Sequence, residues 1–438
     1  MARMIRQVVV LGANGAMGAG SGAVFASAGL RTVFLARSRD KAEAGAAKAE
    51  AAVKSTALRA LIETGSYDED FERTVGAADL IFEAVGEDLS IKRELFARVD
   101  AARAPGAIVA TVSSGLSIAA MCEGRSDDFR AHFLGMHFFN PPTVITGMEL
   151  IPHAGTSAEV TAAVRELLNA RCGRMLIETT DTPAFAGNRI GFRVLGEVAQ
   201  LAQEHGPVKL DALLGSHTGR AMPPLATIDF VGWDVHKAIV DNLHAHTRDV
   251  AHDAFALPAY MQQLIDAGHL GAKTPGKGGF FRAEGKGKEA RVLALDPRAS
   301  QPGTYRPVAE LAYELPAFVR EMKQALRVGR YARAWDIFCD APGADAELMR
   351  KVILGYVSYG LGLVGEVVAA VRDVDRIMGW GFNWAPPGLL ADIIGPARAA
   401  SLMERAGLPV PRALTAAAAS GAPMFTEPHA DRGRFLFA

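Results

Sequence analysis

Short apolar runs alternate with helical stretches over about the first 180 residues of the chain. This alternation is typical of a parallel sheet covered by helices. We expect strands at 7–12, 31–36, 78–85, 107–112, 133–139 and 148–151, and helices at 17–28, 40–62, 88–101 and 157–170. The pattern therefore predicts an N-terminal α/β domain.

The pattern changes twice further along the chain. After the loop at 181–183 (DTP), longer helical segments replace the β-branched runs, and around 283–306 glycine, proline and charged residues interrupt the apolar spacing. Glycine and proline clusters between periodic segments indicate loops and domain boundaries. We therefore predict an α/β domain at 1–183 followed by two mainly α-helical domains at 184–284 and 285–438.

The two helical regions resemble each other. Residues 220–232 (RAMPPLATIDFVG) align without a gap with 383–395 (NWAPPGLLADIIG), so that a Pro-Pro pair, an aspartate and a glycine coincide. Upstream, 195–199 (LGEVA) matches 364–368 (VGEVV) in the same order. Two matches in one order indicate a duplicated domain whose second copy has diverged.

Composition narrows the classes of function. Half of the 438 residues are hydrophobic, and 47 basic side chains balance 48 acidic ones, which excludes a disordered chain and a globally basic nucleic-acid binder. The three cysteines lie far apart, so we expect no disulfide framework, no metal site and a reducing, cytoplasmic compartment. The apolar stretch at 351–372 contains Glu366 and several glycines, which favours a buried helix over a membrane span.

The first predicted strand ends in a glycine-rich loop. Glycines permit a tight turn and close approach to a pyrophosphate, and the N-terminus of the following helix attracts the anion. We therefore predict a Rossmann-like dinucleotide site formed by Gly12, Gly15, Ala16, Met17 and Gly18. The spacing GxxGxxG is one residue longer than the usual GxGxxG, so the turn must differ in detail.

The end of the second predicted strand bears on the choice of cofactor. A carboxylate there normally accepts the ribose 2′-hydroxyl of NAD. Arg37, Ser38 and Arg39 stand there instead, and two guanidinium groups beside a hydroxyl suit a 2′-phosphate. NADP is therefore an alternative to NAD, unless both arginines are solvated surface charges.

Four candidate polar residues are ambiguous when taken singly. His137 lies in an apolar run, where a histidine is more often a hydrogen-bonded core residue, and strand alternation turns Glu149 away from its apolar neighbours, as on a solvated edge. Ser114 could be a turn or cap residue, and Asn188 an ordinary helix residue.

Four sequence elements, taken together, give a more specific signal. HFFNP at 137–141, the glutamate at 149, DTPAFAGNR at 181–189 and KTPGKGGF at 273–280 resemble the motifs of the 3-hydroxyacyl-CoA dehydrogenase family. The resemblance covers most of the chain and, through the duplication, extends to the dehydrogenase part of the multifunctional β-oxidation enzymes. No enoyl-CoA hydratase segment is recognisable.

The resemblance implies a reaction and its residues. It implies NAD(P)-dependent interconversion of a (3S)-3-hydroxyacyl-CoA and a 3-oxoacyl-CoA, with His137 as general base or acid, Glu149 as its orienting partner, and Ser114 and Asn188 as substrate-binding groups. These roles are chemically coherent, because imidazole exchanges protons near neutral pH and a carboxylate behind it fixes its tautomer.

The resemblance also implies contacts with the cofactor. Glu87 and Lys92, the second on an expected helical surface, match family positions that line the dinucleotide, as do Asn140 and Lys273. Since single-copy relatives pair their helical domain with that of a partner, the second copy here could take the partner's place, giving a monomer or, through another surface, a homodimer.

The departures from the family pattern keep two alternatives open. Val112 replaces the usual asparagine two residues before Ser114, Pro275 lies in a lengthened terminal element, and Asn14 and Arg37 alter the cofactor loop. The alternatives are a dehydrogenase of a free hydroxy acid on the same fold and a non-catalytic dinucleotide-binding protein.

Overall fold

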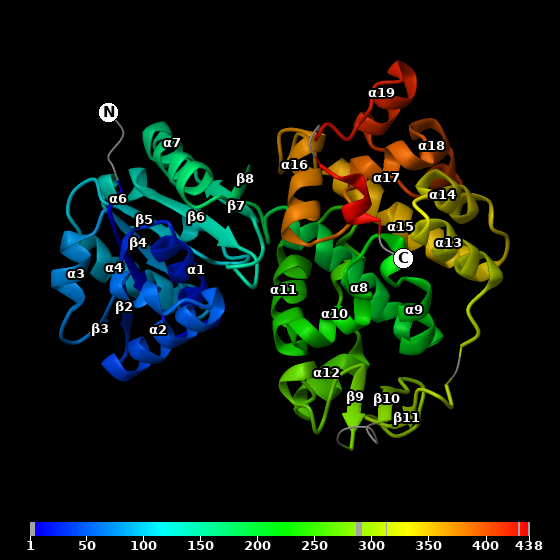
Figure 1. Cartoon of the computed structure of the whole chain (residues 1–438), viewed down its shortest axis with the longest axis horizontal. Helices are drawn as coiled ribbons and strands as arrows, with labels where there is room; N and C mark the ends of the chain where they lie inside the picture. Colours follow the sequence, from blue (N-terminus) through cyan, green and yellow to red (C-terminus); the bar gives the residue numbers. More distant parts are fainter. Residues whose placement is uncertain (1–4, 286–290, 312, 428–429, 437–438) are drawn as a thin grey trace. The chain divides into compact units, whose positions relative to one another are not determined.

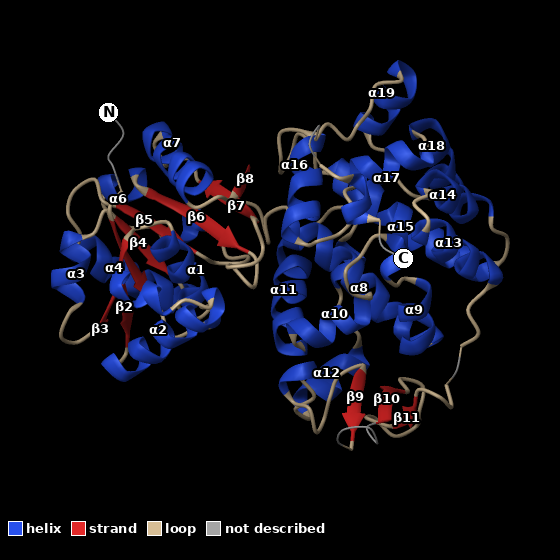
Figure 2. Ribbon diagram, viewed as in Figure 1, coloured by secondary structure: helices blue, strands red, loops and turns tan. Residues whose placement is uncertain are grey.

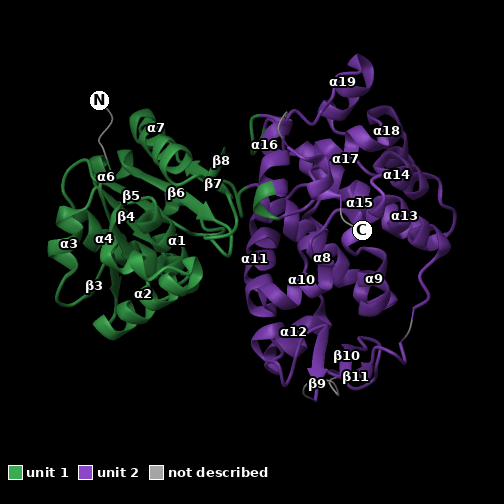
Figure 3. Ribbon diagram, in the orientation of Figure 1, with its two compact units in different colours: residues 1–185, 366–369, 380–382 green, residues 186–365, 370–379, 383–438 purple. Residues whose placement is uncertain are grey.

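The computed structural model describes residues 5–285, 291–311, 313–427 and 430–436. The chain divides into two compact units, which Figure 3 shows in different colours. Unit 1 comprises residues 1–185 with the short segments 366–369 and 380–382, and unit 2 comprises the remaining residues. Figures 1 and 2 show that unit 1 is an α/β structure and that unit 2 is mainly helical.

Unit 1 is built on an eight-stranded sheet with the order β3-β2-β1-β4-β5-β6-β7-β8. All neighbouring strands are parallel except β6 and β7. The strands are β1 Gln7–Leu11, β2 Arg31–Ala36, β3 Ile62–Ser66, β4 Leu80–Glu83, β5 Ile108–Thr111, β6 Phe133–Phe138, β7 Gly147–Pro152 and β8 Met175–Glu178. The helices are α1 Ala16–Ser27, α2 Arg39–Val53, α3 Phe71–Ala77, α4 Leu89–Ala102, α5 Ile118–Met121, α6 Asp127–Ala131 and α7 Ala158–Glu166.

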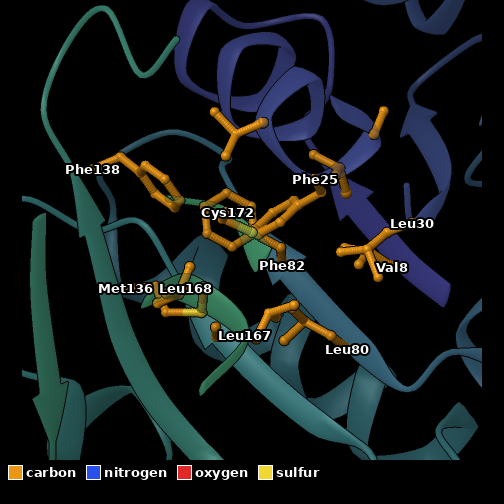
Figure 4. Packing of buried hydrophobic residues seen from close by; sticks show 14 of the residues in the cluster. Val8, Phe25, Leu30, Leu80, Phe82, Met136, Phe138, Leu167, Leu168 and Cys172 are labelled. Carbon is orange, nitrogen blue, oxygen red and sulfur yellow. The ribbon is translucent and has the colours of Figure 1, made fainter. Parts of the chain in front are cut away.

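Helices cover both faces of this sheet, and each face has its own hydrophobic core. Because successive strand residues point to opposite faces, Val8 and Val10 pack under α1, α2 and α7, whereas Val9 packs on the other side, under α3, α4 and α6. Figure 4 shows the first core, where Phe25 and Phe82 meet edge to face at 5.3 Å between ring centroids. Burial on both faces explains why the strands read as continuous apolar runs.

Several features of unit 1 differ from the sequence prediction, which also did not include the short helices α3, α5 and α6. Strands β3 and β8 were not predicted, because both are short and β3 (IETGS) is largely polar. The helix predicted at 40–62 was too long: α2 ends at Val53, and Lys54 follows in the left-handed region with φ +54°.

Unit 2 contains both helical regions and one small sheet. Its helices are α8 Gly187–His205, α9 Pro207–Leu213, α10 Pro224–Val231, α11 Trp233–His246, α12 Ala259–Asp266, α13 Ala317–Arg327, α14 Tyr331–Asp340, α15 Ala344–Gly362, α16 Val371–Arg376, α17 Pro387–Ile394, α18 Pro396–Arg405 and α19 Arg412–Ser420. The segment read as an irregular break contains three antiparallel strands: β9 Phe281–Glu284, β10 Arg291–Leu295 and β11 Tyr305–Pro307.

The first of the two repeat matches corresponds to equivalent local structure. Helices α10 and α17 both begin at a Pro-Pro pair and end at a glycine with positive φ. Asp229 of α10 accepts hydrogen bonds from two successive backbone amides at 280–281, and Asp392 of α17 does the same at 424–425. Each aspartate thus ties its helix to a later segment of the same region.

The second repeat match is not supported by the structure. Residues 195–199 lie within α8, whereas 364–368 follow the end of α15 and are not helical. The stretch at 351–372 is accordingly not one continuous helix. Across the described parts of the chain, no helix combines the length and apolar character needed to cross a bilayer.

Candidate active site

The candidate acid–base pair lies on the two antiparallel strands of unit 1. In the register of β6 and β7, His137 stands directly opposite Glu149. The ring Nδ1 of His137 is 2.7 Å from Oε2 of Glu149. Because a carboxylate can only accept, Nδ1 carries the proton and Nε2 is the ring nitrogen with a lone pair. The pair therefore presents a proton acceptor whose tautomer is set by its neighbour.

Both members of the pair are buried, which corrects the sequence interpretation of Glu149 as a solvated edge residue. The side chain of Glu149 is 0% exposed and that of His137 is 3% exposed. Strand β8, which was not predicted, pairs with β7 and removes that edge. The neighbouring Met148 and Leu150 belong to the core on the opposite face of the sheet.

Aromatic side chains surround the histidine ring. Phe139 lies edge-on to His137 at 4.8 Å between ring centroids, and Phe185 lies at 5.6 Å. Apolar neighbours exclude water, so the charge–dipole interaction between imidazole and carboxylate is stronger here than at the surface. The rings also restrict the orientation of the imidazole, as a positioned general base requires.

The glycine-rich loop follows β1 as predicted and leads into α1. Gly12 has φ +82°, and a Cβ there would come 2.4 Å from the carbonyl oxygen of Ala84. A Cβ on Gly18 would come 2.4 Å from the carbonyl oxygen of Gly12. Gly15 caps α1, and a Cβ there would find only an ordinary contact at 3.5 Å. Packing therefore explains Gly12 and Gly18, whereas a bare backbone at Gly15 is not required by the fold.

The other residues predicted in or near the cofactor site are partly or fully accessible to solvent. Ala16 is exposed and Met17 is half-buried, both in the first turn of α1. Asn140, immediately after β6 and Phe139, is exposed. Tyr67, which was not predicted, accepts a hydrogen bond from the backbone N–H of Gly12 at 2.8 Å, and burial raises the pKa of Tyr67 to about 12.

The two arginines after β2 are in different situations. Arg39 donates to the carboxylate of Asp70 at 2.9 Å and to the carbonyl oxygen of Thr64 at 2.6 Å, so it links α2 to β3. Arg37 is exposed. Of the pair considered for a 2′-phosphate, only Arg37 therefore lacks an evident structural task.

Glu87 and Lys92, both predicted to line the dinucleotide, belong to a connected polar cluster. Lys92 was expected on a helical surface, but its side chain is 0% exposed and is paired with Glu83, because the first turn of α4 packs onto the end of β4. Glu87 accepts a hydrogen bond from the backbone N–H of Ser114 at 2.9 Å. Glu83 was missed, although a glutamate inside the apolar run ADLIFEAV was a detectable signal.

Two predicted residues belong to unit 2. Asn188 lies in the first turn of α8 and is buried. Lys273 lies at the end of the short 3₁₀ helix Gly271–Lys273 and forms an ion pair with Asp234 at 2.7 Å. Lys273 is exposed. Among the described residues, no group of three or more His, Cys, Asp and Glu side chains is placed to hold a metal ion.

Comparison of the sequence with models of known protein families assigns this chain to one of them. Residues 7–182 match the model of the 3-hydroxyacyl-CoA dehydrogenase NAD-binding domain, and residues 185–281 match that of the C-terminal domain of the same enzymes. The chain belongs to the 3-hydroxyacyl-CoA dehydrogenase family. The resemblance seen in the motifs is thereby confirmed, as is the α/β class with a Rossmann-like N-terminal sheet.

Individual relatives of this dehydrogenase family differ in length. A Bacillus subtilis protein named "Probable 3-hydroxyacyl-CoA dehydrogenase" is 29% identical over 440 residues, covering 94% of this chain and 54% of that protein. This chain thus spans about half the length of that relative. A Deinococcus radiodurans protein of the same name is 31% identical over 301 residues, covering 66% of this chain and 85% of its own.

The fold likeness extends to the second helical region. The crystal structure of 3-hydroxybutyryl-CoA dehydrogenase from Escherichia coli K12 superimposes with a TM-score of 0.68. The match covers 95% of this chain and 99% of that one, at 22% sequence identity. At this identity the comparison shows that the two proteins share a fold.

Proposed function

We propose that this chain is an NAD-dependent 3-hydroxyacyl-CoA dehydrogenase that interconverts a (3S)-3-hydroxyacyl-CoA and a 3-oxoacyl-CoA. The observation that carries the proposal is the buried pair of His137 and Glu149, 2.7 Å apart, in a chain of this family. We assign His137 as the general base of oxidation and the general acid of reduction, and Glu149 as its orienting partner.

The geometry of the pair supports these roles. With its Nδ1–H donated to Glu149, His137 can accept the proton of a substrate hydroxyl at Nε2. The imidazolium formed in that step is stabilised by the adjacent carboxylate of Glu149. In the reverse direction, the same Nε2–H protonates the oxygen of the 3-oxo group.

The residues after β1 fit a dinucleotide. The turn at Gly12, the bare backbone at Gly15 and the N-terminus of α1 provide the close approach and positive dipole end that a pyrophosphate requires. When bound, NAD supplies the hydride acceptor. We assign Gly12, Gly15, Ala16, Met17 and Gly18 to its phosphates.

The remaining predicted contacts complete the proposal. We assign Ser114 and Asn188 to the substrate oxygen, which hydroxyl and amide groups can orient toward the base. We assign Glu87, Asn140 and Lys273 to the cofactor, and Lys92 to a supporting position behind Glu87, because it is fully buried. Arg37 is the residue that would admit NADP besides NAD.

The proposal is tested by absorbance at 340 nm with acetoacetyl-CoA, run in parallel with NADH and NADPH. We expect NADH to be consumed, and consumption of NADPH at a similar rate would assign the 2′-phosphate to Arg37. Free acetoacetate is the matched control, because it has the same 3-oxo group without the CoA. Activity with acetoacetate alone would favour the free-acid dehydrogenase, and no turnover with bound cofactor would favour the non-catalytic protein.

We also propose that the protein is monomeric and cytoplasmic. The second helical region has the local structure of the first around α10 and α17, which is what a replacement for a partner's domain requires. The three cysteines are free and buried, as expected in a reducing compartment. Light scattering should give a mass near 46.4 kDa, and a mass twice as large would contradict the monomer.

A further inference from the structure

A buried ion pair lies behind the loop that carries Ser114. Glu83, the last residue of β4, and Lys92, in the first turn of α4, both have side chains that are 0% exposed. The ammonium nitrogen of Lys92 donates to both carboxylate oxygens of Glu83, at 2.7 and 2.8 Å. The hydroxyl of Thr111 and the backbone N–H of Val85 also donate to Glu83, at 2.5 and 2.6 Å. Every oxygen of this carboxylate is thus engaged.

The pair continues into the Ser113–Ser114 turn through a second carboxylate. The ammonium of Lys92 is 3.6 Å from Oε2 of Glu87. The other oxygen of Glu87 accepts hydrogen bonds from the hydroxyl of Ser113 at 2.5 Å and from the backbone N–H of Ser114 at 2.9 Å. The turn after β5 is therefore connected to the end of β4 by Glu83, Lys92 and Glu87, in that order.

Stability alone does not account for this arrangement. Removing an ammonium and a carboxylate from water costs about as much as their attraction returns, so an apolar pair would serve the core equally well. A cation in the first turn of a helix is also repelled by the positive end of the helix dipole. What the pair does provide is a fixed positive charge that holds Glu87 in one position.

We propose that Glu83 and Lys92 are positioning residues for Ser114. Glu83 fixes the ammonium of Lys92, Lys92 holds Glu87, and Glu87 holds the backbone of Ser114 in place to meet the substrate. The inference rests on the proposed function, because Ser114 matters only if its hydroxyl binds the substrate. It adds a role for Glu83, which has no place in the acid–base pair or in the glycine-rich loop.

The test uses a double variant that removes both charges. Glu83→Gln alone leaves a buried ammonium without its main partner and is expected to destabilise the protein. Glu83→Gln with Lys92→Met leaves no fully buried charge unpaired, because the side chain of Glu87 is 42% exposed, and should fold. We expect the double variant to keep its melting temperature but to lose about 10- to 100-fold in kcat/KM, as misplacement of a substrate contact does. If the pair had only a structural role, the double variant would regain both the stability and the activity that Glu83→Gln alone loses. That result would overturn the proposal.

The matched control is another ion pair in the same unit. The guanidinium of Arg103 is paired with Asp128 at 2.5 Å, and both side chains bind the segment that precedes β5, through the carbonyl oxygen of Ala107 and the backbone N–H of Gly106. Arg103→Met with Asp128→Asn likewise removes one cation and one anion, of which Arg103 is buried and Asp128 is 44% exposed. The control variant should retain the kcat/KM of the wild type, and an equal loss in both variants would overturn the specific role of Glu83 and Lys92.

Two further readouts separate this proposal from the proposed function. Hydrogen exchange of the peptide 112–117, measured without substrate, should be faster in the Glu83/Lys92 double variant and unchanged in the control.

In a Ser114→Ala background, the double variant should lose no more than about 2-fold further in kcat/KM, since the two changes act through one contact. Unchanged exchange, or losses that simply multiply, would overturn the proposal. An inactive wild type would refute the proposed function, while exchange would still decide the positioning role.

Discussion

Unit 1 buries His137 and unit 2 buries His236, and these two histidines have different surroundings. His137 on β6 donates from Nδ1 to Glu149 at 2.7 Å. His236 on α11 is 0% exposed and packs against Phe192 at 5.5 Å between ring centroids. Within the described residues, neither ring nitrogen of His236 has a hydrogen-bond partner. Burial without a partner lowers the pKa of His236 to about 3, so its imidazole is neutral at physiological pH.

The comparison indicates which surroundings a buried histidine needs for the acid–base role that we propose for His137. Burial alone makes the protonated form of imidazole unfavourable, and a histidine so placed cannot take up a proton during turnover. A buried carboxylate at hydrogen-bond distance reverses this, because it stabilises the imidazolium and fixes the tautomer. The carboxylate of Glu149, rather than burial or an apolar sequence context, is therefore the feature on which the proposed acid–base role of His137 rests.

The largest effect should come from removing the ring of His137. His137→Gln should lower kcat by roughly 10²- to 10⁴-fold with acetoacetyl-CoA and NADH, because we assign the proton transfer to this imidazole. His236→Gln is the matched control and should keep kcat near that of the wild type. A folded His137→Gln protein with ordinary turnover would show that the difference between the two histidines has no catalytic meaning.

A smaller loss should follow when the carboxylate is removed and the imidazole is kept. Glu149→Gln should reduce kcat by about 10²-fold, because the amide can donate to Nδ1 and so favour the wrong tautomer. The expected loss is in kcat rather than KM, since Glu149 acts through His137. An equal kcat in Glu149→Gln and the wild type would mean that the carboxylate does not distinguish the two sites.

The smallest of the three effects concerns stability in acid. The folded-state pKa of His236 lies below its unfolded value of 6.5, so the unfolded state takes up the proton first and stability is lost as the pH falls below 6.5. Between pH 7 and pH 5 this costs about 2 kcal/mol. His236→Phe should remove that part of the acid sensitivity in urea-unfolding measurements at the two pH values.

Comparing the variant with the wild type isolates His236 from other groups in unit 2. Burial lowers the pKa of His217 to about 4, which acts in the same direction as His236. Burial raises the pKa of Asp211 to about 7 and that of Asp229 to about 6, so these carboxyl groups gain protons on folding and favour the folded state as the pH falls. All three titrate in both proteins and cancel in the difference. Identical acid sensitivity would contradict the assignment of His236 as a neutral core residue.

Much of the fold could be predicted because apolar periodicity is a local signal. Strand β2 was expected at 31–36 and spans Arg31–Ala36, since its burial on both faces leaves an uninterrupted apolar run. Strand β3 was not found, because its sequence IETGS is polar and its pairing with β2 is a long-range contact. The match between 195–199 and 364–368 was also misleading, because the two similar sequences are helical in one place and not in the other.

The candidate site shows where such prediction ends. His137, Glu149 and the glycine-rich loop could be identified by motif, because their residue types and spacing match the family. The burial of Glu149 depends on β8, and that of Lys92 depends on Glu83, nine residues earlier. Neither pairing can be read from a local pattern, although Glu83 itself stands out in its apolar run. The candidate residues could therefore be predicted from the sequence, whereas their mutual contacts are known only from the tertiary structure.

The central claim is that Glu149 holds His137 in the form that can accept a proton at Nε2. Nitrogen-15 NMR of histidine-labelled protein tests it most directly, with His137→Gln and His236→Phe to assign the two rings. We predict that His137 carries its proton on Nδ1 and that Glu149→Gln changes this tautomer, while His236 stays neutral down to pH 5. A proton on Nε2 of His137 in the wild type, or a tautomer indifferent to Glu149, would contradict the claim.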